Sequence, residues 1–304
     1  MYGSIGGWMF NMYLKSFSNH GNKEASLMIR ALLKSSDIMY RSVYNVSRPE
    51  DFDELRQNQN FLYSITKRLV IEALSDANSS RKSLASVLTS LDMSIEQITT
   101  AFVGIFQESV EPVSLTLTWA LYHLARSPEV QEIFRKKIRK IISLSNYQPN
   151  LKRQRIPNRQ YLEDPEIIEY FNKIIAETFR LNYPTIGLKR ILQTSRIISG
   201  YSIPANTLVS TQNQLVGRMA KYFEDPLIFN PERRFEFKSM VLMPYGIGRV
   251  CGGAWFAKKI MLIALVNMVS SFEISYNYED IGYINKLYNQ PSRRIILTMK
   301  ETKI

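Results

Sequence analysis

The chain has 304 residues, of which 45% are hydrophobic and 12% aromatic, so it can bury a core in one large domain or two smaller ones and is not expected to be disordered. Its net charge of +12, from 39 Lys and Arg against 27 Asp and Glu, favours an acidic partner or surface. The basic residues are scattered through amphipathic helices rather than gathered in a tail or a reading motif, which excludes nucleic acid as the expected partner.

No apolar stretch reaches the roughly 18 to 20 residues that a helix needs to cross a bilayer. The densest one, Ile260–Val269, is bounded by Lys259 and Ser270, so we expect no transmembrane helix in this chain. Residues 1–8 lack the basic and apolar regions of a secretory signal and the Arg-rich pattern of a transit peptide, and no targeting sequence is expected. One cysteine, Cys251, cannot form an internal disulfide, which by itself indicates a reducing compartment and an inert buried thiol.

Helical patterns dominate the first half of the chain. Apolar residues at helical spacing predict a helix from Phe61 to Leu74, followed by a loop at residues 76–82. Ser94 to Gln97 has the pattern of a capping box, and apolar positions continue beyond it, which predicts one helix over residues 94–126. About 30 helical residues would extend roughly 45 Å. The helix is expected to end at Ser127-Pro128, because the residue before proline avoids the helical region.

Two further helices are predicted in the middle of the chain. One begins at Pro128, and residues 145–161 after it are expected to form a basic loop. Asp164-Pro165 has the pattern of a helix start and predicts a helix over residues 165–182. The helix from Pro128 carries basic residues on one face, expected to be either a solvated surface or a docking face: Arg135, Lys136, Lys137, Arg139 and Lys140.

Beyond Pro184 the pattern changes to short apolar runs separated by Gly200 and Pro204, which is typical of short strands. After Cys251 one more helix is predicted to run to Ser271. The fold class expected from all these elements is mainly α with a minor β-sheet, in a single domain over residues 1–304. The predicted strands are residues 188–194, 196–198, 207–210, 272–276 and 294–299.

The chemistry is concentrated in residues 244–253, Pro-Tyr-Gly-Ile-Gly-Arg-Val-Cys-Gly-Gly, which lie just before the last predicted helix. Glycines let the backbone approach something flat and close, and backbone N–H groups at a helix N-terminus can hold a thiolate of Cys251. A thiolate is a soft ligand that suits haem iron. From this loop alone, a buried structural cysteine in a glycine turn is the alternative.

Two other motifs precede this loop. Glu177-Thr178-Phe179-Arg180 places an acid and a base one helical turn apart, so that they can pair, and Arg233 of Pro231-Glu232-Arg233 can join them. A Glu-x-x-Arg pair, a Pro-x-Arg segment and a cysteine loop, in that order, resemble the cytochrome P450 family. The resemblance extends from about Leu91 to the C-terminus and is strongest to the mitochondrial group. Residues 114–131 are similar to the second half of that group's oxygen-binding helix, residues 186–190 resemble its propionate-binding strand, and residues 203–209 and 217–218 also fit.

The resemblance implies a cytochrome P450 fold and a role for each matching residue. Cys251 would be the axial ligand of haem iron, and Arg190 and Arg249 would bind the haem propionates. His123 is expected to be an ordinary helix residue and His20 has no companion. Tyr245, Gly246 and Gly253 would also contact haem, while Glu177, Arg180 and Arg233 would be structural.

Three features depart from the family pattern. Gly248 runs straight into Arg249, so the loop is one residue short, and Tyr245 stands where phenylalanine is usual. In the long helix, Glu111 keeps the family's acid but Pro112 replaces the threonine that helps to pass protons to bound oxygen. Glu111 is therefore either a catalytic acid or a helix carboxylate without a catalytic part, and Ser109 or Ser114 would have to substitute for the threonine hydroxyl. The chain also looks like a C-terminal fragment, with an N-terminally incomplete fold.

The expected function is a haem-thiolate monooxygenase that inserts one atom of O2 into a lipophilic, sterol-like substrate. The alternatives are a haem-thiolate isomerase or lyase, which needs no O2 activation, and an inactive truncated paralogue. By resemblance the electron donor is an acidic ferredoxin, for which Lys173, Lys258 and Lys259 are suitably basic although Asn172 and Ala176 stand where docking lysines are usual. The same resemblance implies the matrix side of the mitochondrial inner membrane, with peripheral membrane association.

Overall fold

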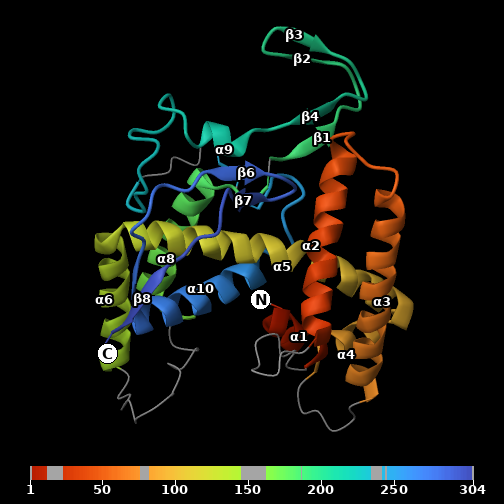
Figure 1. Ribbon diagram of the computed structural model, residues 1–304, viewed down its shortest axis with the longest axis horizontal. Helices are drawn as coiled ribbons and strands as arrows, with labels where there is room; N and C mark the ends of the chain where they lie inside the picture. Colours follow the sequence, from red (N-terminus) through yellow and green to blue (C-terminus); the bar gives the residue numbers. More distant parts are fainter. Residues whose placement is uncertain are drawn as a thin grey trace. The chain divides into compact units, whose positions relative to one another are not determined.

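The computed structural model describes residues 2–11, 23–75, 82–144, 162–185, 187–233, 242–243 and 245–302. The chain divides into two compact units, Met1–Ser114 and Leu115–Ile304. Figure 1 shows the helices and strands of both units, which are described here one at a time. The loops predicted at residues 76–81 and 145–161 lie outside the described residues, as does His20.

The first unit consists of helices. Phe10 packs against Phe102 and Phe106, with ring centroids 5.3 and 6.2 Å apart, and all three are buried. A buried Asp51 begins the third helix and accepts hydrogen bonds from Arg41 of the second helix, which joins the two. The helices are α1 (Tyr2–Phe10), α2 (Lys23–Val43), α3 (Asp51–Ser75), α4 (Leu84–Thr89) and the first part of α5 (Ile95–Arg126).

The long helix α5 has the predicted start and end. Ser94 and Gln97 form the capping box, because the N–H of Gln97 donates to the Ser94 hydroxyl at 3.2 Å and the N–H of Ser94 donates to the Gln97 side chain at 2.9 Å. The helix runs for 32 residues with Pro112 inside it and ends before Ser127. Of the other helices in the first unit, only α3 was predicted, and it begins ten residues earlier than expected, at Asp51 rather than Phe61.

The second unit holds the last turns of α5 and the helices α6 (Pro128–Leu144), α8 (Pro165–Leu181), α9 (Asn213–Val216) and α10 (Ala254–Ser271). Asp164 caps α8, since its carboxylate accepts the N–H of Ile167 at 2.9 Å. Helix α6 packs against both α8 and α10, and Phe134 of α6 contacts Tyr170 of α8 with ring centroids 5.9 Å apart. The predicted boundaries of α6 and α8 are confirmed to within one residue, and α10 ends at Ser271 as predicted.

Arg135 of α6 corrects the prediction of a solvated basic face. It is only 5% exposed. Its guanidinium donates to the carbonyl oxygens of Val269 and Phe272, each at 3.0 Å, and to the side chain of Gln131 at 2.6 Å. The last carbonyls of a helix lack hydrogen-bond partners within the helix. Arg135 therefore acts as the hydrogen-bond donor for the carbonyls at the end of α10.

In the part of the chain that the structure describes, the strands form four separate antiparallel pairs, so the expected minor sheet is divided. β1 (Lys189–Ile191) pairs with β4 (Leu208–Ser210), and β2 (Arg196–Ile198) pairs with β3 (Tyr201–Ile203). β5 (Phe272–Ser275) pairs with β8 (Thr298–Glu301), and β6 (Tyr283–Asn285) pairs with β7 (Asn289–Pro291). Strands β3, β6 and β7 were not predicted, and β8 lies later than the predicted run at 294–299.

Helix α10 is long and apolar enough to cross a membrane when judged by length and composition alone. Those two properties also fit a core helix, and α10 packs against α6 and β5. Met261, Leu265 and Val269 on the packed side are buried.

Candidate functional site

The loop before α10 presents the thiol of Cys251 to solvent. The loop is closed by its own backbone, because the N–H of Cys251 donates to the carbonyl oxygen of Tyr245 at 2.8 Å. The N–H of Ala254, the first residue of α10, donates to the carbonyl oxygen of Cys251 at 3.2 Å. A Cβ added at Gly253 would lie 3.8 Å from the sulfur, so any side chain there would begin in contact with the thiol. Pro244, the first residue of the predicted loop, lies outside the described residues.

Glycines are needed at two turns of this loop. Gly246 and Gly248 have left-handed backbone angles, with φ of 91° and 74°. A Cβ at Gly246 would also lie 3.2 Å from the carbonyl oxygen of Arg249, a contact tight enough to require movement. A side chain would therefore strain the backbone at both positions, and at Gly246 it would also crowd the Arg249 carbonyl.

Arg190 links β1 to the cysteine loop. Its guanidinium donates to the carbonyl oxygen of Ile247 at 3.1 Å and to that of Lys189 at 2.8 Å. Arg249 lies in the loop itself, and both side chains are exposed. Among the described residues, neither guanidinium forms an ion pair with a carboxylate. Two arginines beside the thiol thus keep donors for a negatively charged ligand.

Tyr245 lies in the first part of the loop. Its ring packs edge-on against Phe179 of α8, with centroids 5.4 Å apart, and the Lys258 ammonium lies 5.3 Å from the ring. The hydroxyl is buried and has no hydrogen-bond partner among the described residues. Burial raises the pKa of the Tyr245 phenol well above its usual range, and the neighbouring Cys251 raises it further.

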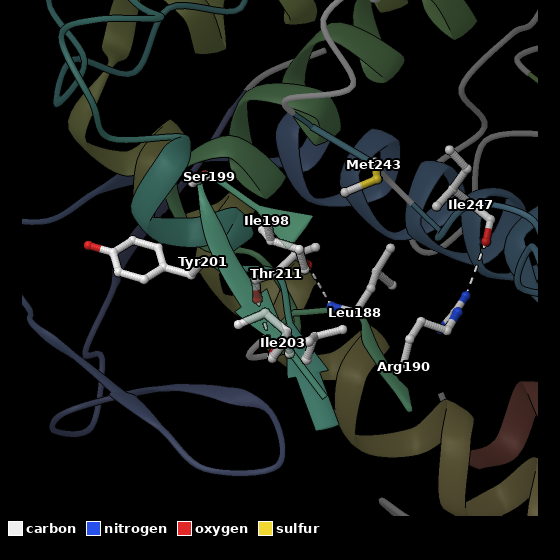
Figure 2. A pocket seen from close by; sticks show the side chains of 11 residues that line it. Leu188, Arg190, Ile198, Ser199, Tyr201, Ile203, Thr211, Met243 and Ile247 are labelled. Carbon is white, nitrogen blue, oxygen red and sulfur yellow. Dashed lines mark hydrogen bonds between the residues drawn. The ribbon is translucent and has the colours of Figure 1, made fainter. Parts of the chain in front are cut away.

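An apolar cavity of about 650 Å³ lies between the strands and the cysteine loop. Figure 2 shows Arg190 and Ile247 on the same side of it, joined by their hydrogen bond, with Met243 nearby. Cys251 is not among the residues that line it. The strands supply most of the wall: Leu188, Ile198, Ser199, Tyr201, Ile203, Val209, Ser210 and Thr211.

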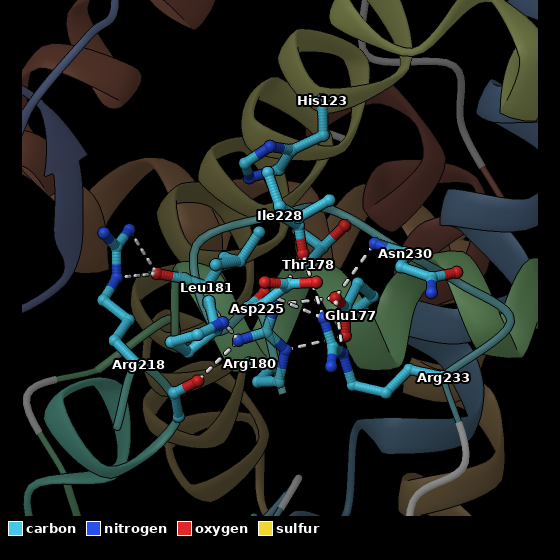
Figure 3. Close-up of polar contacts among 12 residues, drawn as sticks. His123, Glu177, Thr178, Arg180, Leu181, Arg218, Asp225, Ile228, Asn230 and Arg233 are labelled. Atoms are coloured by element: carbon cyan, nitrogen blue, oxygen red, sulfur yellow. Dashed lines mark hydrogen bonds and ion pairs between the residues drawn. The ribbon is translucent and has the colours of Figure 1, made fainter. Parts of the chain in front are cut away.

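Glu177 and Arg180 of α8 form the ion pair that their spacing predicts. Both side chains are fully buried, and two hydrogen bonds of 2.8 and 2.6 Å join them in a bidentate arrangement. Arg180 also donates to the carbonyl oxygens of Gly217, Pro226 and Ile228, at 2.6, 2.5 and 3.0 Å. One guanidinium thus holds two stretches of backbone, the end of α9 at Gly217 and the segment that contains Pro226 and Ile228 (Figure 3).

Arg233 joins the pair, as the sequence predicts. Its Nε lies 3.3 Å from the Glu177 carboxylate, which also accepts the N–H of Asn230 at 3.0 Å. The Arg233 guanidinium donates to the carbonyl oxygens of Glu224, Asp225 and Ile228 (Figure 3). The segment from Glu224 to Arg233 has no regular structure, so these bonds take the place of a helix or sheet ladder.

Glu111 and Pro112 belong to the first unit, whereas Cys251 belongs to the second. The Glu111 side chain is buried, and Pro112 lies within the continuous helix α5. The hydroxyls of Ser109 and Ser114, the two expected substitutes for the family's threonine, donate to the carbonyl oxygens of Ile105 and Val110 on the same helix.

His123 is held inside the second unit as part of the packing. Its ring stacks on Phe229, with centroids 4.7 Å apart and planes 5° apart, and its Nε2 lies 2.8 Å from the Asn182 side-chain oxygen (Figure 3). Burial, and to a smaller extent the positive charges of Arg218, Arg126 and Arg180, lower the pKa of His123 to about 4.

Sequence reasoning missed two members of this network. Asn182 follows the last residue of α8, and Arg218 donates to the carbonyl oxygen of Leu181 at 2.9 and 2.7 Å. The sequence does not indicate the contact of Asn182 with His123 or that of Arg218 with Leu181, because the partners lie far apart in the chain.

The arrangement suits one class of ligand. A thiol can supply one bond to a soft metal, and two guanidiniums free of carboxylate partners can bind carboxylates. The described residues contain no cluster of three His, Cys, Asp or Glu side chains that could hold a metal ion. These residues can offer a bound group one soft ligand, from Cys251, and two cationic donors, from Arg190 and Arg249.

Three comparisons with known proteins bear on this site. The family model described as "Cytochrome P450" matches residues 1–299. The chain is 25% identical over 256 residues to "Cytochrome P450 302a1, mitochondrial" of Drosophila melanogaster, covering 82% of this chain and 50% of the relative. It is 25% identical over 299 residues to "Cholesterol side-chain cleavage enzyme, mitochondrial" of Macaca fascicularis, covering 91% and 54%. The chain thus spans about half the length of these curated relatives.

A solved structure shares the fold. The chain superposes on the "Crystal structure of cytochrome P450DA heme domain" with a TM-score of 0.79 and 17% sequence identity, covering 99% of this chain and 66% of the other.

Proposed function

The chain belongs to the cytochrome P450 family, and on this basis we propose that it binds haem through Cys251 and inserts one oxygen atom from O2 into a lipophilic substrate. The observation that carries the proposal is the exposed thiol of Cys251 on a loop closed by the Cys251–Tyr245 backbone bond and joined to β1 through Arg190. Haem would supply the activation of O2, and the protein supplies position and charge.

Each site residue has a proposed part in holding the group. Cys251 would be the single protein ligand of the iron, and Arg190 and Arg249 would pair with the two propionates. Gly246 and Gly253 would let the backbone come close to the ring, with Tyr245 in the first part of the loop. Glu177, Arg180 and Arg233 would act at a distance, because they hold the segment that leads into the loop.

Glu111 is proposed to carry a proton toward the reacting centre. The Glu111 side chain is buried, and a carboxyl group can take up and pass on a proton. Pro112 supplies neither a hydroxyl nor an N–H at the position where the family has threonine. This difference favours a second function, a haem-thiolate isomerase or lyase, for which the hydroxyl matters less. An inactive paralogue is the third reading, favoured by the short loop.

Substrate, partner and location are proposed from the relatives. Two of the relatives are named as mitochondrial, one of them a cholesterol side-chain cleavage enzyme, which supports a sterol-like substrate and the matrix side of the mitochondrial inner membrane. A ferredoxin-type acidic donor suits the net charge of +12. Of the lysines predicted to meet it, Lys173 already pairs with Glu169 and Glu232, which leaves Lys258 as the more available one.

A haem titration of the whole chain tests the proposal. The reduced protein with carbon monoxide should show a thiolate-type Soret band, and Cys251→Ser should abolish it. Val250→Ser, which changes the exposed neighbour of the cysteine, is the matched control and should keep the band. A band that survives Cys251→Ser would refute the ligand assignment. Oxygen uptake with an electron donor and a sterol then separates the monooxygenase from the isomerase or lyase.

A further inference from the structure

Two buried amide side chains of the second unit, those of Gln214 in α9 and Asn289 in β7, contact each other. Asn289 is 1% exposed and Gln214 is 4% exposed. The Nδ2 of Asn289 donates to the Oε1 of Gln214, and this bond joins α9 to the β6–β7 hairpin, which lies beside it (Figure 1). Neither residue lines the apolar cavity, so the pair is separate from the site described above.

The contact leaves one donor and one acceptor of the amide pair unsatisfied. The Nε2 of Gln214 and the Oδ1 of Asn289 are buried and have no hydrogen-bond partner among the residues that the structure describes. Rotating both amides by half a turn would exchange the roles of their atoms and would again leave one donor and one acceptor unsatisfied. Rotating only one amide would place two nitrogens or two oxygens against each other. The two amides therefore cannot satisfy each other in this contact.

A third buried amide, that of Asn213, precedes Gln214 in the sequence. Asn213 is 1% exposed, and its Nδ2 also has no hydrogen-bond partner in the described part of the chain. Its Oδ1 accepts the hydroxyl of Thr211 at 2.5 Å, and the Thr211 oxygen accepts the N–H of Leu188 at 2.8 Å. Thr211 and Leu188 line the apolar cavity. The amides therefore lie where α9 connects the β6–β7 hairpin to the wall of the cavity.

The unsatisfied atoms of the pair match the chemistry of water. Burying a polar atom without a partner costs free energy, so such atoms are usually bonded to the protein or to an ordered water. A buried water both donates and accepts, and it makes about three hydrogen bonds to polar groups that lack other partners. A bound anion would leave the Asn289 oxygen unsatisfied, and a bound cation would leave the Gln214 nitrogen unsatisfied.

We propose that Gln214 and Asn289 form an internal binding site for one ordered water molecule, which accepts from Gln214, donates to Asn289 and holds the β6–β7 hairpin on α9. The backbone of Asn289 is already fixed on two sides. Its N–H donates to the carbonyl oxygen of Pro184 at 2.9 Å, and its carbonyl oxygen accepts the indole N–H of Trp119 at 3.4 Å. The water adds a link from the Asn289 side chain, so the position of the hairpin depends on the amide of Gln214.

Magnetic relaxation dispersion of the water signal tests the site in a solution of the whole chain, because it counts internal waters that exchange slowly with the solvent. Gln214→Met, which keeps the length of the side chain without its amide, should lower this number by one. Leu215→Met is the matched control, because it introduces the same side chain at the next position of α9, which is exposed. It should leave the number unchanged. Equal numbers in Gln214→Met and the unchanged chain would overturn the proposal.

A crystal structure of the unchanged chain gives a second answer that does not depend on how a variant folds. It should show one ordered water within hydrogen-bond distance of both amides, and two direct bonds between the amides without a water would overturn the site. Hydrogen exchange at the Asn289 N–H should be at least about tenfold faster in Gln214→Met than in Leu215→Met, because the hairpin loses its side-chain link to α9. Equal exchange in the two variants would refute the role of the water in holding the hairpin.

Discussion

Two tyrosines pack against Phe179 and differ in what their hydroxyls contact. Tyr183 donates to the carbonyl oxygen of Met243 at 2.6 Å, whereas the Tyr245 hydroxyl has no partner among the described residues. Tyr245→Phe should therefore leave stability unchanged or raise the free energy of unfolding by about 1 kcal/mol, because a buried unpaired hydroxyl is removed. Tyr183→Phe should lower it by about 1 kcal/mol, since the hydrogen bond from the Tyr183 hydroxyl to the Met243 carbonyl is lost.

Urea unfolding of both variants measures the difference. The sequence identifies Tyr245 as a departure from the family's phenylalanine but cannot show whether its hydroxyl finds a partner, which depends on neighbours distant in sequence. A loss of stability in Tyr245→Phe comparable to that in Tyr183→Phe would mean that the Tyr245 hydroxyl is bonded in solution.

His123 should make the stability of the second unit depend on pH. Its pKa is about 4 in the folded chain, against 6.5 for the free side chain, so the unfolded chain binds a proton more readily. Stability from this group is therefore fully present above pH 6.5 and is lost as pH falls toward 4. The expected loss between pH 7 and pH 5 is about 2 kcal/mol.

Unfolding midpoints of His123→Gln at the two pH values check this expectation. The variant should lose less stability than the unchanged chain on going to pH 5. His20→Gln is the control, because it removes the only other histidine of the chain. An equal pH dependence in His123→Gln and the unchanged chain would show that His123 is solvated enough to take up a proton in the folded state.

Among the secondary-structure elements, α8 carries a fully buried ion pair, between Glu177 and Arg180. Glu177→Ala would leave the Arg180 guanidinium charged and buried without its carboxylate, at a cost of about 3 to 5 kcal/mol. Glu169→Ala on the same helix removes an exposed partner of Lys173 and should cost less than about 1 kcal/mol. Denaturant unfolding compares the two, and haem content should fall only in Glu177→Ala. Similar small losses in both variants would place the Glu177 pair on a solvated surface in solution.

Elements with strong local signals could be predicted, and elements set by distant contacts could not. The capping box at Ser94 and the Asp164 cap are local and appear where expected. Strand β3 has only three residues between turn signals, and its pairing with β2 is what makes it a strand. Arg135 is one of the basic residues of α6, but its guanidinium donates to carbonyls at the end of α10. The spacing of residues within α6 cannot show this contact.

For the chain as a whole, the family was predictable because three motifs occur in order over a long stretch. The pairing of Glu177 with Arg180 was predictable from helix spacing, and the participation of Arg233 from the order of the motifs. The three backbone carbonyls that each of the two arginines contacts were not predictable. The roles of Cys251, Arg190, Arg249 and Glu111 stay predictions, since they depend on a bound group. The thiol is exposed, so the expectation of a buried cysteine is wrong.

Pro112 links the stability of the longest helix to the proposed chemistry. Proline within a helix removes one backbone hydrogen bond and costs up to about 3 kcal/mol. Pro112→Thr restores an N–H and adds a hydroxyl one residue from the buried Glu111. We expect a gain in the free energy of unfolding of at most about 3 kcal/mol, and less if the surrounding packing is adapted to proline.

The same substitution should change how electrons are used if the haem-loaded protein is a monooxygenase. With proline, proton delivery is impaired and part of the reducing equivalents should leave as hydrogen peroxide. Pro112→Thr should raise product and lower peroxide per electron consumed, at matched haem content. Val113→Thr, which places the same side chain one residue further along α5, should leave the ratio unchanged. The hydroxyls of Ser109 and Ser114 already donate to carbonyls of α5, so neither is free to take the threonine's place without breaking that bond. Tight coupling with proline and no improvement with threonine would assign the proton path to Glu111 and ordered water, and Pro112 would then be no defect.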